Sequence, residues 1–421
     1  MTSFWCEQAW MGGQAVPSVA VEAAADGKIT AIEVGVDAED RHRLNGLVYP
    51  GLANTHSHAF HRALRGMPAA QKDFWTWREE MYRVADRLDP DSYRELAAAV
   101  YREMALAGFT AVGEFHYLHH GPGGRAYSDP NAMGESLREA AASAGIRLTL
   151  LDTCYLEGGI GKALSPTQQR FSDRSVEAWS ERRLRLQNDA NTRIGAAVHS
   201  IRAAKPDDLA QVAAESESLP LHVHLSEQAA ENEAAQAAYG QSPTELLQRT
   251  GVLGPLTTAV HAIHLSPEDR RMLADSGATV CACPTTEADL GDGVGPFSEL
   301  AREGVPLAVG TDQHVRIDPF EEVRRLEMDQ RLETGIRGHF DAGQLVEILS
   351  ENGYRSIGWD EGGKIAVGSF CDLVAIRTDT VRTSGIEASA LLWAAGPCDV
   401  HEVVVGGRTI VRQGVHLLSD E

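Results

Sequence analysis

Between residues 50 and 362, short apolar runs alternate with stretches rich in alanine, glutamate and arginine. Such alternation is typical of buried parallel strands joined by crossover helices. The strand candidates lie at 47–54, 109–115, 147–155, 193–199, 221–225, 258–264, 279–284 and 306–310. Helices are expected at 92–107, 135–144, 206–216, 227–238, 243–250 and 319–334. Eight strands with helical connections over about 310 residues predict an α/β fold, the (β/α)8 TIM barrel.

An open doubly wound sheet is the alternative arrangement of alternating strands and helices. That fold would place a glycine-rich phosphate-binding turn directly after the first strand. This chain has Thr55-His56-Ser57-His58 at that point instead. The barrel is therefore favoured for residues 50–362.

Both ends of the chain have a different, β-rich pattern. Asp26-Gly27 near the amino end and Gly406-Gly407 near the carboxyl end are turn signals between apolar runs. We therefore expect one small β-sandwich domain, built from residues 1–49 and 363–421, that brackets the barrel.

The composition excludes several classes of function. The formal net charge is −22 at pH 7, whereas a nucleic-acid-binding surface needs clustered lysine and arginine. No run reaches about 18 apolar residues, so no membrane span is expected. The six cysteines form no CxxC pair, and the amino end lacks a basic and apolar leader, which indicates reduced thiols. We expect a cytoplasmic enzyme with no nucleic-acid or membrane partner.

Histidines gather where the predicted strands end, which is where a βα barrel presents its reactive groups. Of the sixteen histidines, all lie at or near these strand ends except His42, His339, His401 and His416. A single core histidine is usually hydrogen-bonded filler, but a cluster on one rim predicts a metal site. His56 and His58 are two residues apart, so that an extended strand would point both imidazoles to the same side.

The order His56-x-His58, His224, His261 and Asp312, on predicted strands one, five, six and eight, resembles the amidohydrolase superfamily. The small β domain made from both termini is also similar to that family. The resemblance implies that His56, His58, His224 and Asp312 bind a divalent metal ion.

The fourth predicted strand bears on the number of metal ions. Binuclear amidohydrolases carry a carboxylated lysine there, whereas this chain has His199, and Lys205 lies beyond the strand. The resemblance therefore implies one ion per chain. Three imidazoles and a carboxylate suit Zn²⁺ first, and also tolerate iron, cobalt or manganese.

The stretch His224-Leu-Ser-Glu227 resembles the His-x-x-Glu of the deaminase branch of the family. The resemblance implies that metal-bound hydroxide attacks a C=N carbon. Asp312 would accept a proton, His261 would orient the nucleophile or polarise the carbon, and Glu227 would deliver protons to the departing nitrogen. The alternative for Glu227 is an ordinary carboxylate at a helix start.

Arginines near the predicted strand ends favour an anionic substrate, because a guanidinium binds carboxylates through two parallel hydrogen bonds. Arg202 follows the fourth strand, and Arg78 and Arg83 follow the first. A solvated helix face is the alternative for Arg78, Arg83 and Arg202.

Four segments, at 56–60, 74–78, 114–117 and 199–202, resemble the enzymes of bacterial histidine degradation that hydrolyse N-formimino-L-glutamate to N-formyl-L-glutamate and ammonia. That resemblance implies a homodimer and substrate contacts from Arg78, Tyr117, His199 and Arg202. His61 stands where those enzymes often have glutamine, and is expected at the substrate as well. His314 is expected either to line the site or to pack under a loop.

Two other functions stay open. Another deaminase of the same family would act on a purine, pyrimidine or nucleoside, and a non-catalytic barrel would bind metal only.

The long connections at 121–131 and 157–175 are expected to overhang the site.

Overall fold

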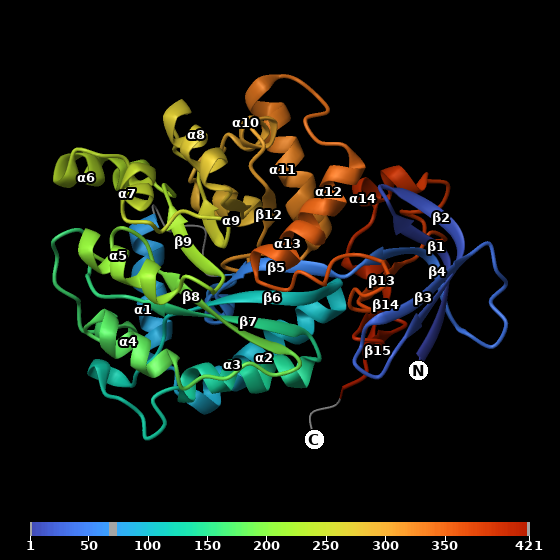
Figure 1. Cartoon of the computed structure of the whole chain (residues 1–421), viewed down its shortest axis with the longest axis horizontal. Helices are drawn as coiled ribbons and strands as arrows, with labels where there is room; N and C mark the ends of the chain where they lie inside the picture. Colours follow the sequence, from blue (N-terminus) through green and yellow to red (C-terminus); the bar gives the residue numbers. More distant parts are fainter. Residues whose placement is uncertain (1, 67–73, 419–421) are drawn as a thin grey trace.

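The computed structural model describes residues 2–66 and 74–418 of the chain. Two eight-stranded sheets dominate it. In Figure 1, helices surround the parallel sheet at the left and centre, and the second sheet lies at the right. The predicted α/β barrel with a β domain from both termini is confirmed.

The parallel sheet follows the chain in order from β5 to β12. Nearly all of its strand residues are buried, as expected where helices cover the outer face of a barrel. The strands are β5 (Leu52–Ser57), β6 (Phe109–His116), β7 (Arg147–Cys154), β8 (Thr192–Val198), β9 (Leu221–Leu225), β10 (Thr257–His261), β11 (Thr279–Ala282) and β12 (Leu307–Val309).

The helices follow the strands and begin at capping signals in the sequence. At α2, Asp89 accepts a hydrogen bond from the Ser92 amide at 2.9 Å, and Pro90 occupies the first turn. The barrel helices are α1 (Phe74–Arg87), α2 (Pro90–Ala107), α3 (Ala132–Ala144), α4 (Val176–Arg183), α5 (Pro206–Glu215), α6 (Ala229–Tyr239), α7 (Pro243–Arg249), α8 (Pro267–Ser276), α9 (Pro284–Leu290), α10 (Phe297–Arg302), α11 (Pro319–Thr334), α12 (Ala342–Leu349) and α13 (Glu351–Ser356).

Several helices were not predicted, and most of these are short. Helices α4, α8, α9, α10, α12 and α13 span six to ten residues. So few turns carry little periodicity for a sequence pattern to reveal. Within the part of the chain that the structure describes, no helix has the length and apolarity needed to cross a bilayer.

The barrel closes between its first and last strands, β5 and β12, through backbone hydrogen bonds between predicted site residues. The Asp312 amide donates to His56 O at 3.0 Å, and the His58 amide donates to Asp312 O at 3.1 Å. A Cβ on Gly310 would lie 2.7 Å from the His56 backbone, so the close approach of the two segments requires glycine. Strand closure and the placement of these side chains therefore depend on the same few hydrogen bonds.

The second sheet combines strands from both termini in the order β16-β15-β14-β13-β4-β1-β2-β3. Strand β4 is parallel to β1 and antiparallel to β13, so this sheet is mixed. Its strands are β1 (Thr2–Met11), β2 (Gln14–Ala23), β3 (Ile29–Val34), β4 (His42–Pro50), β13 (Leu373–Ile376), β14 (Val400–Val405), β15 (Arg408–Arg412) and β16 (Val415–His416). The domain limits at residues 49 and 363 stay a prediction.

One predicted strand is divided between the two sheets. The apolar run at 47–54 predicts a single strand, but the structure splits it at Gly51 into the ends of β4 and β5. A Cβ on Gly51 would lie 2.6 Å from Tyr354 Oη, so only glycine fits where the chain passes from one sheet to the other. The run is uniformly apolar because both strands are buried, and apolarity alone does not reveal the change of sheet.

A buried ion pair joins the barrel to the second sheet. Arg147, at the start of β7, donates from Nε and Nη2 to the Asp372 carboxylate at 2.7 and 3.0 Å. Tyr354 Oη and the Gly406 amide donate to the same carboxylate at 2.7 and 2.6 Å. The Arg147 and Asp372 side chains are 3% and 0% exposed, so losing one partner leaves a charge without water or a counterion.

We expect Arg147→Met to lower the free energy of unfolding by about 3–5 kcal/mol, because Asp372 loses its buried counterion. The measurement is the midpoint of urea unfolding followed by tryptophan fluorescence. Arg377→Met is the control, because it breaks an exposed pair with Asp379 and should leave the midpoint unchanged. Equal shifts in the two variants would contradict the assignment.

Candidate active site and metal centre

A cavity of about 360 Å³ opens at the carboxyl ends of the barrel strands. Barrels present their reactive groups at this end, and the volume suits a small molecule. The wall combines imidazoles, carboxylates and arginines with aromatic rings, and it includes His58, His61, Trp77, Arg78, Tyr82, Tyr117, Tyr155, Phe171, His199, Arg202, His224, Glu227, Glu231, His261 and Asp312.

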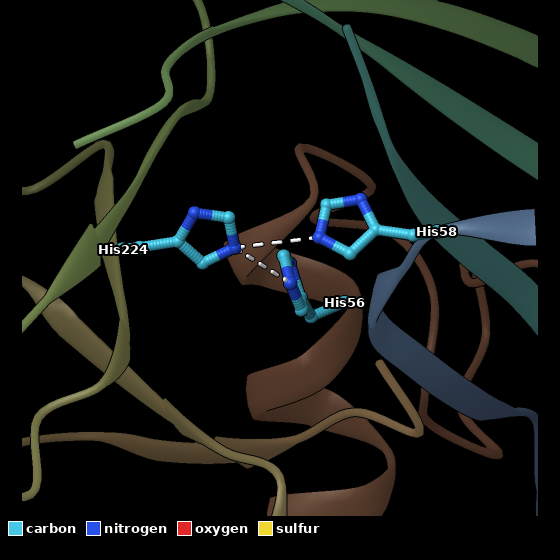
Figure 2. A group of neighbouring side chains, drawn as sticks. All are labelled: His56, His58 and His224. Atoms are coloured by element: carbon cyan, nitrogen blue, oxygen red, sulfur yellow. Dashed lines mark hydrogen bonds between the residues drawn. The ribbon is translucent and has the colours of Figure 1, made fainter. Parts of the chain in front are cut away.

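Three imidazoles converge on one another, as Figure 2 shows, and together they could hold a metal ion. His224 Nε2 lies 3.2 Å from His56 Nε2 and 3.4 Å from His58 Nε2. Asp312 Oδ1 lies 3.5 and 3.6 Å from the same two nitrogens of His56 and His58. Donors at these separations can share one ion at about 2.1 Å from each, which is a typical zinc–ligand distance. The four side chains therefore fit a divalent cation.

The backbone orients two of the three rings. His58 Nδ1 donates to Phe115 O at 2.9 Å, and His224 Nδ1 donates to His199 O at 2.8 Å. A carbonyl oxygen can only accept, so in both rings the proton is on Nδ1 and the Nε2 lone pair is free for a metal. Burial lowers the pKa of His56 and His224, and it lowers that of His58 to about 3. All three rings are thus neutral, as ligands must be.

Backbone strain accompanies the site. His261, Asp312 and Ser226 have φ angles of +71°, +44° and +47°, in the left-handed region that side-chain-bearing residues rarely adopt. Such conformations persist where surrounding structure holds them in place, and they cluster at functional sites.

His261 lies among three carboxylates. Its Nδ1 is 3.3 Å from Glu287 Oε1, and its Nε2 is 3.8 Å from Glu227 Oε1 and 3.9 Å from Asp312 Oδ2. Burial disfavours a charge on His261, but Glu227, Glu287 and Asp312 together raise its pKa to about 10. The ring can therefore act as a hydrogen-bond donor towards the cavity.

Two arginines on the cavity wall come from different elements. Arg78 is on α1, and Arg202 follows β8. Arg202 Nη2 donates to Glu227 Oε2 at 3.1 Å. Both arginines can therefore meet an anionic ligand in the cavity.

Two further polar groups on the wall contact each other: His61 Nε2 and Tyr117 Oη lie 2.8 Å apart.

The structure brings together every predicted site residue except one. His314 is buried outside the cavity wall, with Nδ1 2.8 Å from Thr311 Oγ1 and Nε2 3.1 Å from Ser57 Oγ. Both ring nitrogens are thus used within the protein. His314 therefore does not line the cavity, and its packing under a loop stays a prediction. Arg83 is 62% exposed and pairs with Glu80 away from the cavity.

Of the two long connections, the second contributes to the wall. Gly158, Gly159, Ile160, Lys162 and Phe171 line the cavity. No residue between 121 and 131 is part of the wall.

Comparison with known proteins fits this geometry. The amidohydrolase family model matches residues 47–410. The chain belongs to the amidohydrolase family. Metal dependence is a property of this family, and the His–Asp cluster of this amidohydrolase is the place at which it could bind an ion.

Individual relatives match over nearly the whole length. A formimidoylglutamate deiminase from Pseudomonas aeruginosa is 36% identical over 436 residues, which cover 99% of this chain and 96% of that protein. A 5-methylthioadenosine/S-adenosylhomocysteine deaminase from Haloarcula marismortui is 27% identical over 428 residues, which cover 97% and 94%. The crystal structure of an amidohydrolase from Brucella melitensis is 32% identical and superposes with a TM-score of 0.91, covering 99% and 96% of the two chains.

Sequence reasoning missed three polar residues of this amidohydrolase site. Tyr155 lies directly after β7 and lines the cavity. Glu287 follows the end of β11 and contacts His261, so the strand-end rule could have found it. Glu231 lies four residues after Glu227, in the first turn of α6, so it reaches the cavity from a helix and the strand-end rule does not find it.

We expect His58→Ala to lower the amount of bound divalent metal by at least about tenfold, because it removes one of the converging Nε2 atoms. Elemental analysis of the purified protein measures this. His264→Ala is the matched control, because His264 lies at the same rim but outside the cavity wall and should leave the metal content unchanged. Full metal occupancy in His58→Ala would contradict the assignment.

Proposed function

We propose that this amidohydrolase is a formimidoylglutamate deiminase, which hydrolyses N-formimino-L-glutamate to N-formyl-L-glutamate and ammonia in histidine degradation. One observation carries the proposal: the cavity of about 360 Å³ holds two arginines together with a metal-binding cluster. A formimino group needs an activated water, and the glutamate part has two carboxylates that suit arginines. The 36% identity to a formimidoylglutamate deiminase over 99% of the chain supports the same substrate.

His56, His58, His224 and Asp312 would hold one divalent ion, with Zn²⁺ the first choice for this donor set. Such an ion, when bound, supplies Lewis-acid activation of water at neutral pH. Across the described residues, β8 and the loop after it bring His199 to the cavity wall and no lysine, which supports one ion rather than two.

The side chains around the ion are placed for proton transfer. Asp312 Oδ2, the oxygen that faces His261, can accept a proton from the attacking water. The His261 imidazolium can donate a hydrogen bond to the oxygen that adds to the formimino carbon. Glu227 faces both His261 and the cavity, so it can deliver protons to the nitrogen that leaves as ammonia.

The substrate carboxylates would meet the arginines and neighbouring polar groups of the wall. Arg78 and Arg202 supply the charges, while His199, Tyr117 and His61 supply further hydrogen bonds. Burial raises the pKa of Tyr117, so its hydroxyl keeps its proton and can donate.

A second candidate is a deaminase of purines, pyrimidines or nucleosides. The rings of Trp77, Tyr82, Tyr155 and Phe171 on the wall favour it, because they could stack on a heteroaromatic base. The 27% identity to a 5-methylthioadenosine/S-adenosylhomocysteine deaminase is in keeping with it. A non-catalytic metal-binding barrel is the remote third candidate.

An ammonia-release assay on metal-quantified protein tests the function. We expect turnover of N-formimino-L-glutamate and none of guanine, cytosine or adenosine. If the protein turns over a base or nucleoside but not N-formimino-L-glutamate, the second candidate function replaces the first.

Glu227→Gln separates an enzyme from a metal-binding barrel. Removing the proton-transferring carboxylate should lower kcat by about 10²–10⁴-fold, while the bound metal stays at the wild-type amount. Steady-state kinetics and elemental analysis on the same preparation measure both. Unchanged ammonia release in the variant would refute the role of Glu227.

Helix α1 offers a matched pair of variants for the substrate carboxylates. Arg78→Met should raise KM for N-formimino-L-glutamate by about tenfold or more, because a wall guanidinium is lost. Arg83→Met removes an arginine of the same helix that points away from the cavity, and should leave KM unchanged. If the two variants have the same KM, Arg78 does not bind the substrate.

The division into residues 1–49 with 363–421 and 50–362 is part of this proposal, as are a homodimeric state and a cytoplasmic location. The chain's fold supports the division, because β4 and β13 pair in one sheet while β5 begins the other.

A further inference from the structure

Glu231 is an acidic side chain in the cavity to which the proposed mechanism gives no task. It lies on α6, one turn after Glu227, and lines the cavity. Its side chain is 0% exposed. Burial raises the pKa of Glu231 to about 7, and the Arg202 guanidinium and a hydrogen bond from the Ser226 backbone oppose that rise. Burying a carboxylate is costly, so its presence calls for an electrostatic reason.

The one ion pair of Glu231 within the described residues is with Arg202, whose Nε lies 3.6 Å from Glu231 Oε2. The same Nε donates to Ser200 Oγ at 3.2 Å, and Nη2 donates to Glu227 Oε2 at 3.1 Å. Arg202 is therefore held between two carboxylates, Glu231 on its Nε side and Glu227 on its Nη2 side. Nη1 has no hydrogen-bond partner in the described part of the chain and is left for a ligand.

This arrangement makes two carboxylates share one guanidinium. An arginine with a single carboxylate neighbour forms a strong charge-assisted hydrogen bond to it, and such a bond stabilises the ionised form of the acid. Glu227 has to gain and lose protons in the proposed reaction, so an exclusive pair with Arg202 would hinder it. A second carboxylate weakens that pair without removing the guanidinium from the cavity.

We propose that Glu231 is a positioning residue that acts through Arg202: it takes a share of the guanidinium charge, which leaves Glu227 free for proton transfer and Nη1 free for a substrate carboxylate. The inference rests on the proposed function. It predicts an effect on kcat rather than a rise in KM, because Glu231 does not itself bind the substrate. As a negative charge beside Arg202, it opposes rather than assists the binding of an anion.

The test is Glu231→Gln in the metal-loaded full-length protein, with N-formimino-L-glutamate as substrate. We expect kcat to fall about tenfold, with KM unchanged or lower and with the wild-type metal content. Glu231→Asp keeps the charge and should retain kcat to within about threefold of the wild type. Glu233→Gln, an exposed carboxylate on the same helix, is the control and should match the wild type in both constants.

The possible results separate this inference from the proposed function. A wild-type protein that releases no ammonia from N-formimino-L-glutamate refutes the proposed function. An active wild type whose Glu231→Gln variant has the same kcat overturns the inference alone. A rise in KM at constant kcat also overturns it, because it would show a role in substrate binding. A loss of metal or of folded protein, or an aspartate variant as slow as the glutamine variant, overturns it as well, because each would show a role other than supplying a charge beside Arg202.

Discussion

The closure of the barrel is the interaction on which the rest of the structure depends. His56 O and the His58 amide bond to the backbone of Asp312, so the first and last strands join through three of the proposed metal ligands. Anything that opened this seam would also separate the Asp312 carboxylate from the imidazoles of His56 and His58. The same closure requires Gly310, whose missing side chain lets the two segments approach. Fold and site are therefore stabilised by one set of contacts.

Away from the metal-binding end, the cavity is organised by alternating charge. His261 faces Glu227, Glu227 accepts from Arg202, and Arg202 faces Glu231. His261, Glu227 and Glu231 are buried and Arg202 is half-buried, so each depends on its neighbour to offset the loss of hydration. The series places the groups proposed for proton transfer beside a guanidinium proposed to bind an anion, within one small space.

Much of this arrangement could be predicted from single positions. Parallel strands all end on one rim, so a histidine or carboxylate after a strand can be assigned to the site without knowing any distance. This rule found His56, His58, His199, His224, His261 and Asp312. It was insufficient for His314, which also follows a strand, because a rim residue can turn into the cavity or pack beneath it. It also overlooked Glu231, which reaches the cavity from a helix rather than from a strand end.

The amino-acid sequence by itself determined the βα alternation and the β-rich ends, because these follow from local periodicity. It also indicated a set of candidate metal ligands, through the histidines at strand ends and the family that their order resembles. Only the tertiary structure decided that the run at 47–54 serves two sheets, that Arg78 rather than Arg83 lines the cavity, and that Glu227 and Glu231 share Arg202. These outcomes depend on which side of an element faces its neighbours, and on contacts between residues far apart in the chain, which no local pattern records.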